Sequence, residues 1–141
     1  MRSMYSKIAA TTVIVFMAFT VASCQEKAME SSAAGVISVD VNVIDFATIL
    51  DTAQTGIILD VRTDQEFASG HISGAQQMNF YDSDFKSQLE TLDPDVPVYI
   101  YCRSGGRSGK AASMMKAMGF KAVYNLEGGV GAWARTQPLA K

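Results

Sequence analysis

Residues 97–118 read PVYIYCRSGGRSGKAASMMKAM. The apolar run at 97–101 predicts a buried strand, and the apolar side chains of residues 110–118 gather on one side of a predicted helix. Cys102 therefore lies at a strand-to-helix turn, where unpaired backbone N–H groups at the start of a helix can point at an anion. This arrangement indicates an α/β fold with a thiol at the end of a strand.

The residues that follow Cys102 favour its thiolate form. Gly105 and Gly106 allow positive φ angles, so that successive amides can form a nest for an anion. Arg103 and Arg107 add positive charge, which lowers the pKa of a cysteine. A buried structural cysteine is the alternative, but such a residue needs neither two arginines nor a Gly-Gly pair. The pattern predicts that Cys102 is an anionic nucleophile.

Charge and composition narrow the class of substrate. A chain of 141 residues with 48% hydrophobic and 18% charged residues indicates one globular domain. The net charge is −2, yet no acidic residue occurs between Asp95 and Glu127, where Arg103, Arg107 and three lysines lie. A local positive region suits a small anionic substrate, whereas nucleic acid would need a broad basic face. No His/Cys cluster has metal-ligand spacing, so we expect neither a metal nor a cofactor.

The first 23 residues are predicted to be a signal peptide. Arg2 and Lys7 precede an uncharged, mostly apolar run at residues 8–22. That run is shorter than the ~20 residues that a membrane-spanning helix needs. Small residues then precede Cys24, as cleavage of a secretory signal requires.

The residues around Cys24 resemble the lipobox of bacterial lipoproteins, in which the cysteine is lipidated and becomes the mature N-terminus. The stretch VASC at 21–24 has Val21 where that family prefers Leu. The resemblance implies a membrane anchor on Cys24 and a periplasm-facing place in the bacterial cell envelope. Gln25 stands where Asp would signal inner-membrane retention in some bacteria, which favours the outer membrane. Cleavage after Ser23 without lipidation, or an uncleaved anchor, are the alternatives.

The rest of the chain alternates strands with helices. Residues 24–35 are polar and small and predict a flexible tether. Strands are expected at residues 36–41, 57–61, 75–80, 96–101 and 122–126. Helices are expected at residues 42–53, 63–70, 83–92, 110–118 and 128–134. This order predicts a domain at 36–137 with a largely parallel, five-stranded central sheet between helices. Asp60, Arg62 and Cys102 should then meet at the carboxyl edge of the sheet, where such folds bind ligands.

From Val36 to Trp133, the sequence resembles a single-domain rhodanese, a thiosulfate-type sulfurtransferase with three layers. The resemblance rests on LDVR at 59–62, EF at 66–67, GHI at 70–72 with GA at 74–75, the Cys102 loop, and GG at 128–129 with Trp133. Ser73 replaces the usual Pro. The loop from Cys102 to Arg107 has six residues, the length that the family's sulfurtransferases use. Related phosphatases and arsenate reductases carry one residue more.

The resemblance implies ping-pong sulfur transfer through a persulfide on Cys102. The donor would be thiosulfate or a persulfide, and the acceptor cyanide or a thiol. If Cys24 is lipidated, Cys102 is the single thiol of the mature chain, so no internal disulfide forms; we also expect a monomer. Arg103 and Arg107 would clamp the oxygens of the donor, and for Arg107 a partly structural role is the alternative. The residues expected to bind substrate are Arg103, Ser104, Gly105, Gly106, Arg107 and Ser108.

Other residues are assigned supporting roles. Asp60 and Arg62 either line the site or form an ion pair that braces the loop. His71 is expected in a structural turn, bonded to Glu66 or to the backbone. Core packing is expected of Phe67, Trp133, Met114, Met115 and Met118. Two rival classes stay open: a cysteine-dependent oxyanion enzyme of the arsenate reductase or phosphatase type, and a non-catalytic sulfur-carrier or protein-binding module.

Overall fold

The computed structural model describes residues 35–141. The predicted signal peptide and Cys24 lie outside the described residues, as does all of the predicted tether except Gly35. Within the described part of the chain, no helix is long and apolar enough to cross a membrane.

The centre of the domain is a five-stranded sheet in the order β1-β5-β4-β2-β3. All four neighbouring strand pairs are parallel. The strands are β1 (Ile37–Val41), β2 (Ile57–Asp60), β3 (Gln76–Gln77), β4 (Val98–Tyr101) and β5 (Ala122–Leu126). The predicted parallel α/β sheet is confirmed. β3 is much shorter than the expected strand at 75–80 and pairs only with Leu59 and Asp60.

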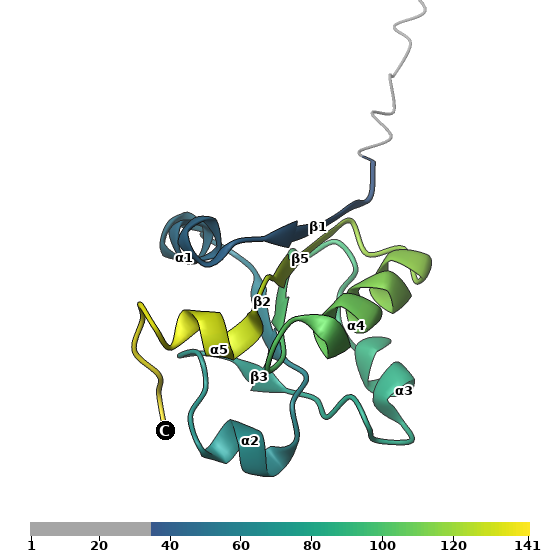
Figure 1. Cartoon of the computed structure of the whole chain (residues 1–141). Coiled ribbons are helices and arrows are strands. Elements are labelled where there is room, and N and C mark those ends of the chain that lie inside the picture. Colours follow the sequence, from purple (N-terminus) through teal and green to yellow (C-terminus); the bar gives the residue numbers. More distant parts are fainter. Residues whose placement is uncertain (1–34) are drawn as a thin grey trace, which may run out of the picture. The chain divides into compact units, whose positions relative to one another are not determined.

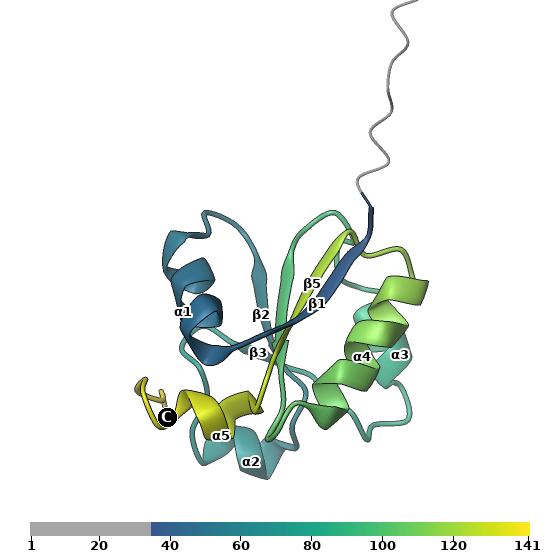
Figure 2. The same cartoon turned by 45° about the horizontal axis from the view of Figure 1, so that its top comes forward.

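Helices cover both faces of the sheet, which gives the expected three layers. α1 and α5 lie on one side, and α3 and α4 lie on the other (Figures 1 and 2). The helices are α1 (Val43–Thr52), α2 (Asp64–Ala68), α3 (Phe85–Leu89), α4 (Gly106–Ala117) and α5 (Gly129–Trp133).

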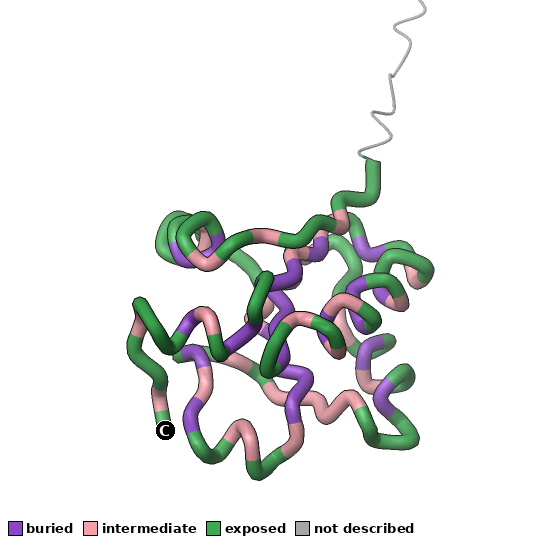
Figure 3. Tube along the Cα trace, viewed as in Figure 1, coloured by how far each residue is buried: buried purple, intermediate pink, exposed green. Residues whose placement is uncertain are grey.

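β4 is the central strand, and its alternation decides where Cys102 points. All four residues of β4 are buried. Val98 and Ile100 belong to the core under α3 and α4, whereas Tyr99 and Tyr101 belong to the core under α1 and α5. Cys102 continues the first set and joins the core under α4. Successive side chains of a strand point to opposite faces, so the thiol is directed toward the start of α4. Figure 3 shows the buried strands at the centre of the domain.

The helix starts follow from local capping. The side chain of Asn42 accepts hydrogen bonds from the amides of Ile44 and Asp45. Thr63 and Glu66 form the reciprocal capping box that the sequence predicts. α4 starts at Gly106, four residues before the expected start at Lys110. The spacing of apolar residues did not predict this first turn of α4, because its residues are small or charged.

The carboxyl-terminal tail is part of the fold beyond the expected boundary at residue 137. His71 and Ala140 exchange two backbone hydrogen bonds of 3.0 and 2.8 Å. The indole of Trp133 donates to the carbonyl of Pro138 at 3.2 Å. These contacts fix the tail beside the turn that follows α2.

Candidate active site

Cys102 lies at the carboxyl end of β4, inside a loop that wraps around its sulfur. Only 1% of the residue is exposed. The amide of Gly105 donates to Sγ at 3.1 Å, and the hydroxyl of Ser108 lies 3.4 Å from it. Gly105 has a φ of 98°, a left-handed conformation that glycine adopts without strain. The expected nest therefore forms, but Gly106 is an ordinary helical residue and does not share the positive φ.

The loop lowers the pKa of the Cys102 thiol. Burial raises this pKa, but hydrogen bonds from the Ser108 hydroxyl and from the amides of Ser108, Ser104 and Gly105 lower it more. These groups stabilise the thiolate because each places a donor at the anion. The sequence predicted this lower pKa from the amides at the helix start and from Arg103 and Arg107 together, and in the structure the amides and the Ser108 hydroxyl account for it.

Of the two roles that the sequence left open for Arg107, the structure shows the structural one, because its guanidinium is paired. Its guanidinium makes two hydrogen bonds of 2.8 Å to the carboxylate of Glu66. The bonds from Arg107 lower the pKa of Glu66 to about 2. Arg107 also lies over the ring of Tyr81, 5.5 Å from its centroid. Arg107 thus ties the loop to α2, and its charge is largely neutralised.

Arg103 remains available for an anion. The residue is exposed, and among the described residues its side chain has neither an ion pair nor a hydrogen bond. Its backbone is held in place, because the amide of Gly131 donates to its carbonyl at 3.1 Å. A fixed backbone with an open cationic side chain is suited to guiding small anions toward Cys102.

α5 supports the loop from beneath. The amide of Val130 donates to the carbonyl of Cys102 at 2.8 Å. Gly129, with a φ of 54°, allows this approach: a Cβ there would collide with the Cys102 carbonyl and lie 2.6 Å from the carbonyl carbon of Arg103. On the β5 side, the buried Asn125 amide lies 3.4 Å from the carbonyl of Gly105. The loop is therefore fixed at both ends.

Asp60 and Arg62 form a buried ion pair rather than a wall of the thiol site. Arg62 Nη2 lies 2.6 Å from Asp60 Oδ2 and 2.7 Å from the carbonyl of Gly70. The guanidinium also lies over the ring of Tyr101, 5.6 Å from its centroid. The expected ion pair is present, but the segment that it holds is the turn at Gly70 and not the Cys102 loop.

Of the other residues that were assigned supporting roles, all but one have the role that the sequence predicted. His71 Nδ1 lies 3.2 Å from the carbonyl of Phe67, which confirms a structural histidine bonded to the backbone. Phe67 is only half-buried and stacks on His71, so its assignment to the core is wrong. Trp133 and Met115 are buried, and Met114 and Met118 pack against the core from its edge, as expected.

The structure places a thiolate, held by amides, at the end of a central parallel strand, and the loop from Cys102 to Arg107 has six residues. This geometry fits the loop expected from the sequence, which also contains the motifs LDVR, GHI and GG. The family model described as "Rhodanese-like domain" matches residues 43–136. The chain belongs to the rhodanese-like family.

Relatives agree with this rhodanese-like assignment. A thiosulfate sulfurtransferase GlpE from Pseudomonas fluorescens is 37% identical over 86 residues, 60% of this chain and 76% of that protein. The uncharacterized protein YqhL from Bacillus subtilis is 40% identical over 76 residues, 54% of this chain and 59% of YqhL. The crystal structure of a rhodanese-like domain protein from Staphylococcus aureus superimposes with a TM-score of 0.60 at 30% identity, covering 67% of this chain and 89% of that one. These similarities support a place in the sulfurtransferase superfamily.

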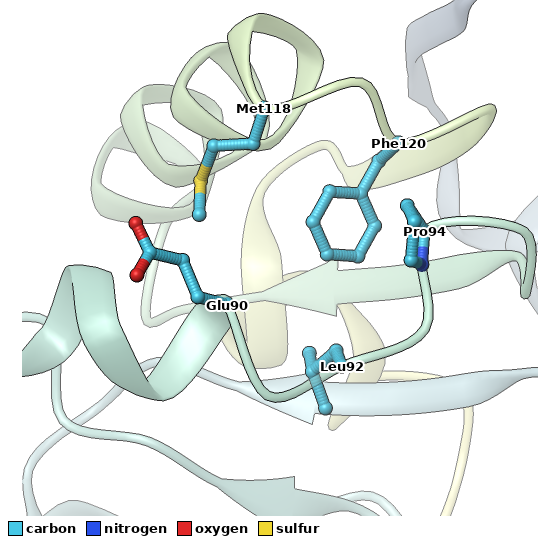
Figure 4. Close-up of a pocket in the computed structure, with 5 residues that line it drawn as sticks. All are labelled: Glu90, Leu92, Pro94, Met118 and Phe120. Atoms are coloured by element: carbon cyan, nitrogen blue, oxygen red, sulfur yellow. The ribbon is translucent and has the colours of Figure 1, made fainter.

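The rhodanese-like domain also has a cavity that lies away from Cys102. A cavity of about 280 Å³ is found at the far end of α4, before the starts of β4 and β5. Figure 4 shows the side chains around it: Glu90, Leu92, Pro94, Met118 and Phe120. None of these residues carries a thiol or a hydroxyl group. In the part of the chain that the structure describes, no group of His, Cys, Asp and Glu is placed to hold a metal.

Three residues of the site were not assigned roles from the sequence. Gly129 appeared only as part of a motif, Asn125 only as part of a strand, and Tyr81 not at all. Asn125 carried a weak signal, because it is the one polar residue in the run AVYNL that precedes the sheet edge. The packing of Gly129 and the position of Tyr81 depend on tertiary contacts that no local pattern shows.

Ser108→Ala is expected to shift the pH dependence of sulfur uptake by Cys102 from thiosulfate to higher pH. The rate follows the thiolate fraction, so it rises with pH through the pKa of Cys102 and then levels off. Because the Ser108 hydroxyl lowers that pKa, its loss should slow uptake about tenfold on the acid side and little on the plateau. Single-turnover kinetics from pH 5 to 9 measures this. An unchanged pH profile would show that the amides alone lower the pKa of Cys102. Ser113→Ala, on the outer face of α4, is the control.

Gly129→Ala is expected to reduce sulfur uptake by about 10²-fold, since displacing a reacting group by about 1 Å has this effect. The new methyl would push the backbone at Cys102 and Arg103. Gly131→Ala is the matched control, because its Cβ would lie 3.3 Å from the Arg103 carbonyl and require only a small adjustment. A Gly129→Ala protein as active as wild type would show that the loop moves aside without loss.

Proposed function

We propose that this protein is a sulfurtransferase that carries sulfur as a persulfide on Cys102. The proposal rests on one observation: a buried sulfur with a lowered pKa, surrounded by amide and hydroxyl donors. The similarity of the chain to a thiosulfate sulfurtransferase also supports sulfur transfer. The cradle suits a thiolate, and also the outer sulfur of a persulfide, because both are anions that accept hydrogen bonds.

In the first step, the Cys102 thiolate attacks the outer sulfur of thiosulfate. A bond forms between Sγ and that sulfur, the sulfur–sulfur bond of thiosulfate breaks, and sulfite leaves with the electron pair. No proton moves, so a general acid is not required. Arg103 is the cation that would attract the donor and the departing sulfite. The enzyme contributes chiefly position and electrostatic stabilisation.

In the second step, a nucleophile removes the outer sulfur. Cyanide would leave as thiocyanate, and a thiolate would leave as a persulfide. In either case the bond to Sγ breaks and Cys102 departs as a thiolate. The donors from Gly105 and Ser108 that favour the resting thiolate also favour it as the leaving group.

The test is the intact mass of the purified protein, before and after thiosulfate and then after cyanide. We expect a gain of one sulfur on Cys102, followed by its loss with release of thiocyanate. If no sulfur is gained while Cys102 can still be alkylated, the proposal fails. Phosphatase and arsenate reductase assays on the same sample then test the oxyanion alternative, for which a seven-residue loop would be usual.

We also propose that the chain is exported and anchored through lipid on Cys24, facing the periplasm. The support is the order of positive residues, apolar run and VASC at residues 21–24. Radiolabelled palmitate should enter the wild-type protein in a bacterial host and not Cys24→Ser. Equal labelling of the two proteins would contradict lipidation at this residue.

A further inference from the structure

Asn125 is a buried polar residue of β5 to which the two chemical steps above assign no part. Only 5% of it is exposed. We propose that Asn125 is a positioning residue that holds Gly105 at the sulfur of Cys102, and that it lowers the stability of the domain in doing so. The inference deepens the proposed function and rests on it, because it takes Cys102 as the sulfur that reacts.

The side-chain amide of Asn125 joins the sheet to the loop. Its Nδ2 atom donates to Asp40 Oδ1 on β1 at 2.7 Å and lies 3.4 Å from the carbonyl oxygen of Gly105. Both partners are acceptors, so only the NH₂ group can face them, and the orientation of the amide is fixed. Gly109, near the start of α4, lies against the same nitrogen, since a Cβ on it would be 3.4 Å away. The amide is therefore enclosed between β1 and α4.

Among the described residues, Asn125 is the only hydrogen-bond partner of Gly105 outside the loop and α4. The carbonyl of Gly105 also accepts from the amide of Gly109 at 2.9 Å and from the hydroxyl of Ser108 at 3.1 Å. Those two donors belong to α4 and move with it. The amide of Gly105 donates to Cys102 Sγ at 3.1 Å. A contact from the sheet to the carbonyl of Gly105 therefore limits how far this donor can move from the sulfur.

The sheet by itself does not favour an asparagine at position 125. Asn125 Oδ1 is shielded from solvent and accepts no hydrogen bond from the residues that the structure describes. A buried acceptor without a donor destabilises the folded state, and asparagine is depleted in strands. In natural proteins, such conflicts with the fold are expected at functional sites. This supports a role for the NH₂ group at the loop.

An apolar side chain at position 125 would leave no polar group stranded. Asp40 is exposed, so water can replace the donor that its carboxylate loses. The carbonyl of Gly105 keeps its two donors from α4. Replacing Asn125 should therefore weaken the hold on the loop without weakening the fold, and these two effects can be measured separately.

The test measures the reactivity of Cys102 without relying on sulfur transfer. The full-length protein is alkylated with iodoacetamide between pH 5 and 9, and the rate at Cys102 is followed by the mass of its peptide, separately from that of Cys24. The wild type is compared with Asn125→Leu, because leucine has the same branched skeleton of side-chain heavy atoms and no polar group. The substitution changes no charge. The melting temperature is measured on the same samples.

We expect Cys102 to be alkylated about fivefold more slowly in Asn125→Leu on the acid side of the profile, and at nearly the wild-type rate on the plateau. Loss of one hydrogen bond between neutral groups has an effect of about this size, and the rate follows the thiolate fraction. The melting temperature should equal or exceed that of the wild type. An unchanged profile would overturn the inference. A shifted profile with a lower melting temperature would also overturn it, since damage to the fold would then disturb the loop.

If Asn125→Leu does not fold, two variants of the exposed Asp40 decide. Asp40→Ala and Asp40→Asn both remove the charge, and only Asp40→Asn keeps an oxygen that can accept from Asn125. Because Asp40 fixes the amide of Asn125 from the side of β1, we expect slower alkylation of Cys102 on the acid side in Asp40→Ala than in Asp40→Asn. Equal profiles in these two variants would overturn the inference.

Failure of the inference can be told apart from failure of the proposed function. If thiosulfate loads one sulfur on Cys102 of the wild type but the alkylation profiles agree, sulfur transfer stands and the positioning role of Asn125 falls. If the alkylation profile shifts as expected but no sulfur is loaded, Asn125 still positions a thiolate, and the proposed function falls.

Discussion

Cys102→Ser is expected to take up no sulfur from thiosulfate and to form thiocyanate at least 10⁴-fold more slowly than the wild type. A serine hydroxyl is not ionised near neutral pH and cannot replace the thiolate as nucleophile. The amide of Gly105 and the hydroxyl of Ser108 would still surround the position, but they act on a charge that no longer exists. Continuous detection of thiocyanate, with intact mass on the same sample, measures the loss.

The loss must be separated from unfolding. Oxygen for sulfur is a small change at a buried position that already faces two donors, so we expect the melting temperature to stay within a few degrees of the wild type. A folded Cys102→Ser protein that kept more than a trace of activity would sink the persulfide mechanism. The one remaining cysteine of the full sequence, Cys24, would then have to be tested as the sulfur carrier.

The thiol site could be predicted largely because its parts are local in sequence. Residues 98–101 are buried on both faces and read as an unbroken apolar run, which is the pattern of a central parallel strand. Cys102 follows at once, and Gly105 adopts the positive φ that the tight turn of the loop requires. The capping box at Thr63 and Glu66 is likewise contained in four residues. Each of these features depends on neighbours within one turn.

The remaining features join distant residues. Glu66 and Arg107 are 41 positions apart, so the sequence could not show that Arg107 is committed to an ion pair. Gly129 is needed because α5 approaches the Cys102 carbonyl, a fact of packing rather than of propensity. α3 and β3 were predicted too long. Met78 and Phe80 beyond β3, and Leu92 beyond α3, pack against the core from loops, so the apolar pattern continues after the regular element has ended.

The second large effect is expected at a residue that does not touch the sulfur. Asp60→Ala should lower the free energy of unfolding by about 3–5 kcal/mol, because it leaves a buried guanidinium without its counter-charge. Asp60 is fully buried, and Arg62 is 4% exposed. Burial lowers the pKa of Arg62, but its hydrogen bonds to Asp60 and the carboxylate charge raise it more, so the charge persists in the folded state. For a domain of about 100 residues, the melting temperature should fall by more than about 10 °C.

A double variant tests the cause. In Asp60→Ala with Arg62→Met no charge is left stranded, so removing both partners should be less harmful than removing Asp60 alone. The carbonyl of Gly70 still loses its donor from Arg62, so recovery should be partial. Calorimetry of the wild type, both single variants and the double variant gives the coupling energy. If the double variant is as unstable as the sum of the single ones, the charges are not coupled, and the effect of Asp60→Ala must come from lost packing against Tyr101 and β4. If the double variant regains stability, this ion pair braces the carboxyl edge of the sheet. The turn at Gly70 then owes its position beside the Cys102 loop to the contact between Asp60 and Arg62, two positions apart in the chain.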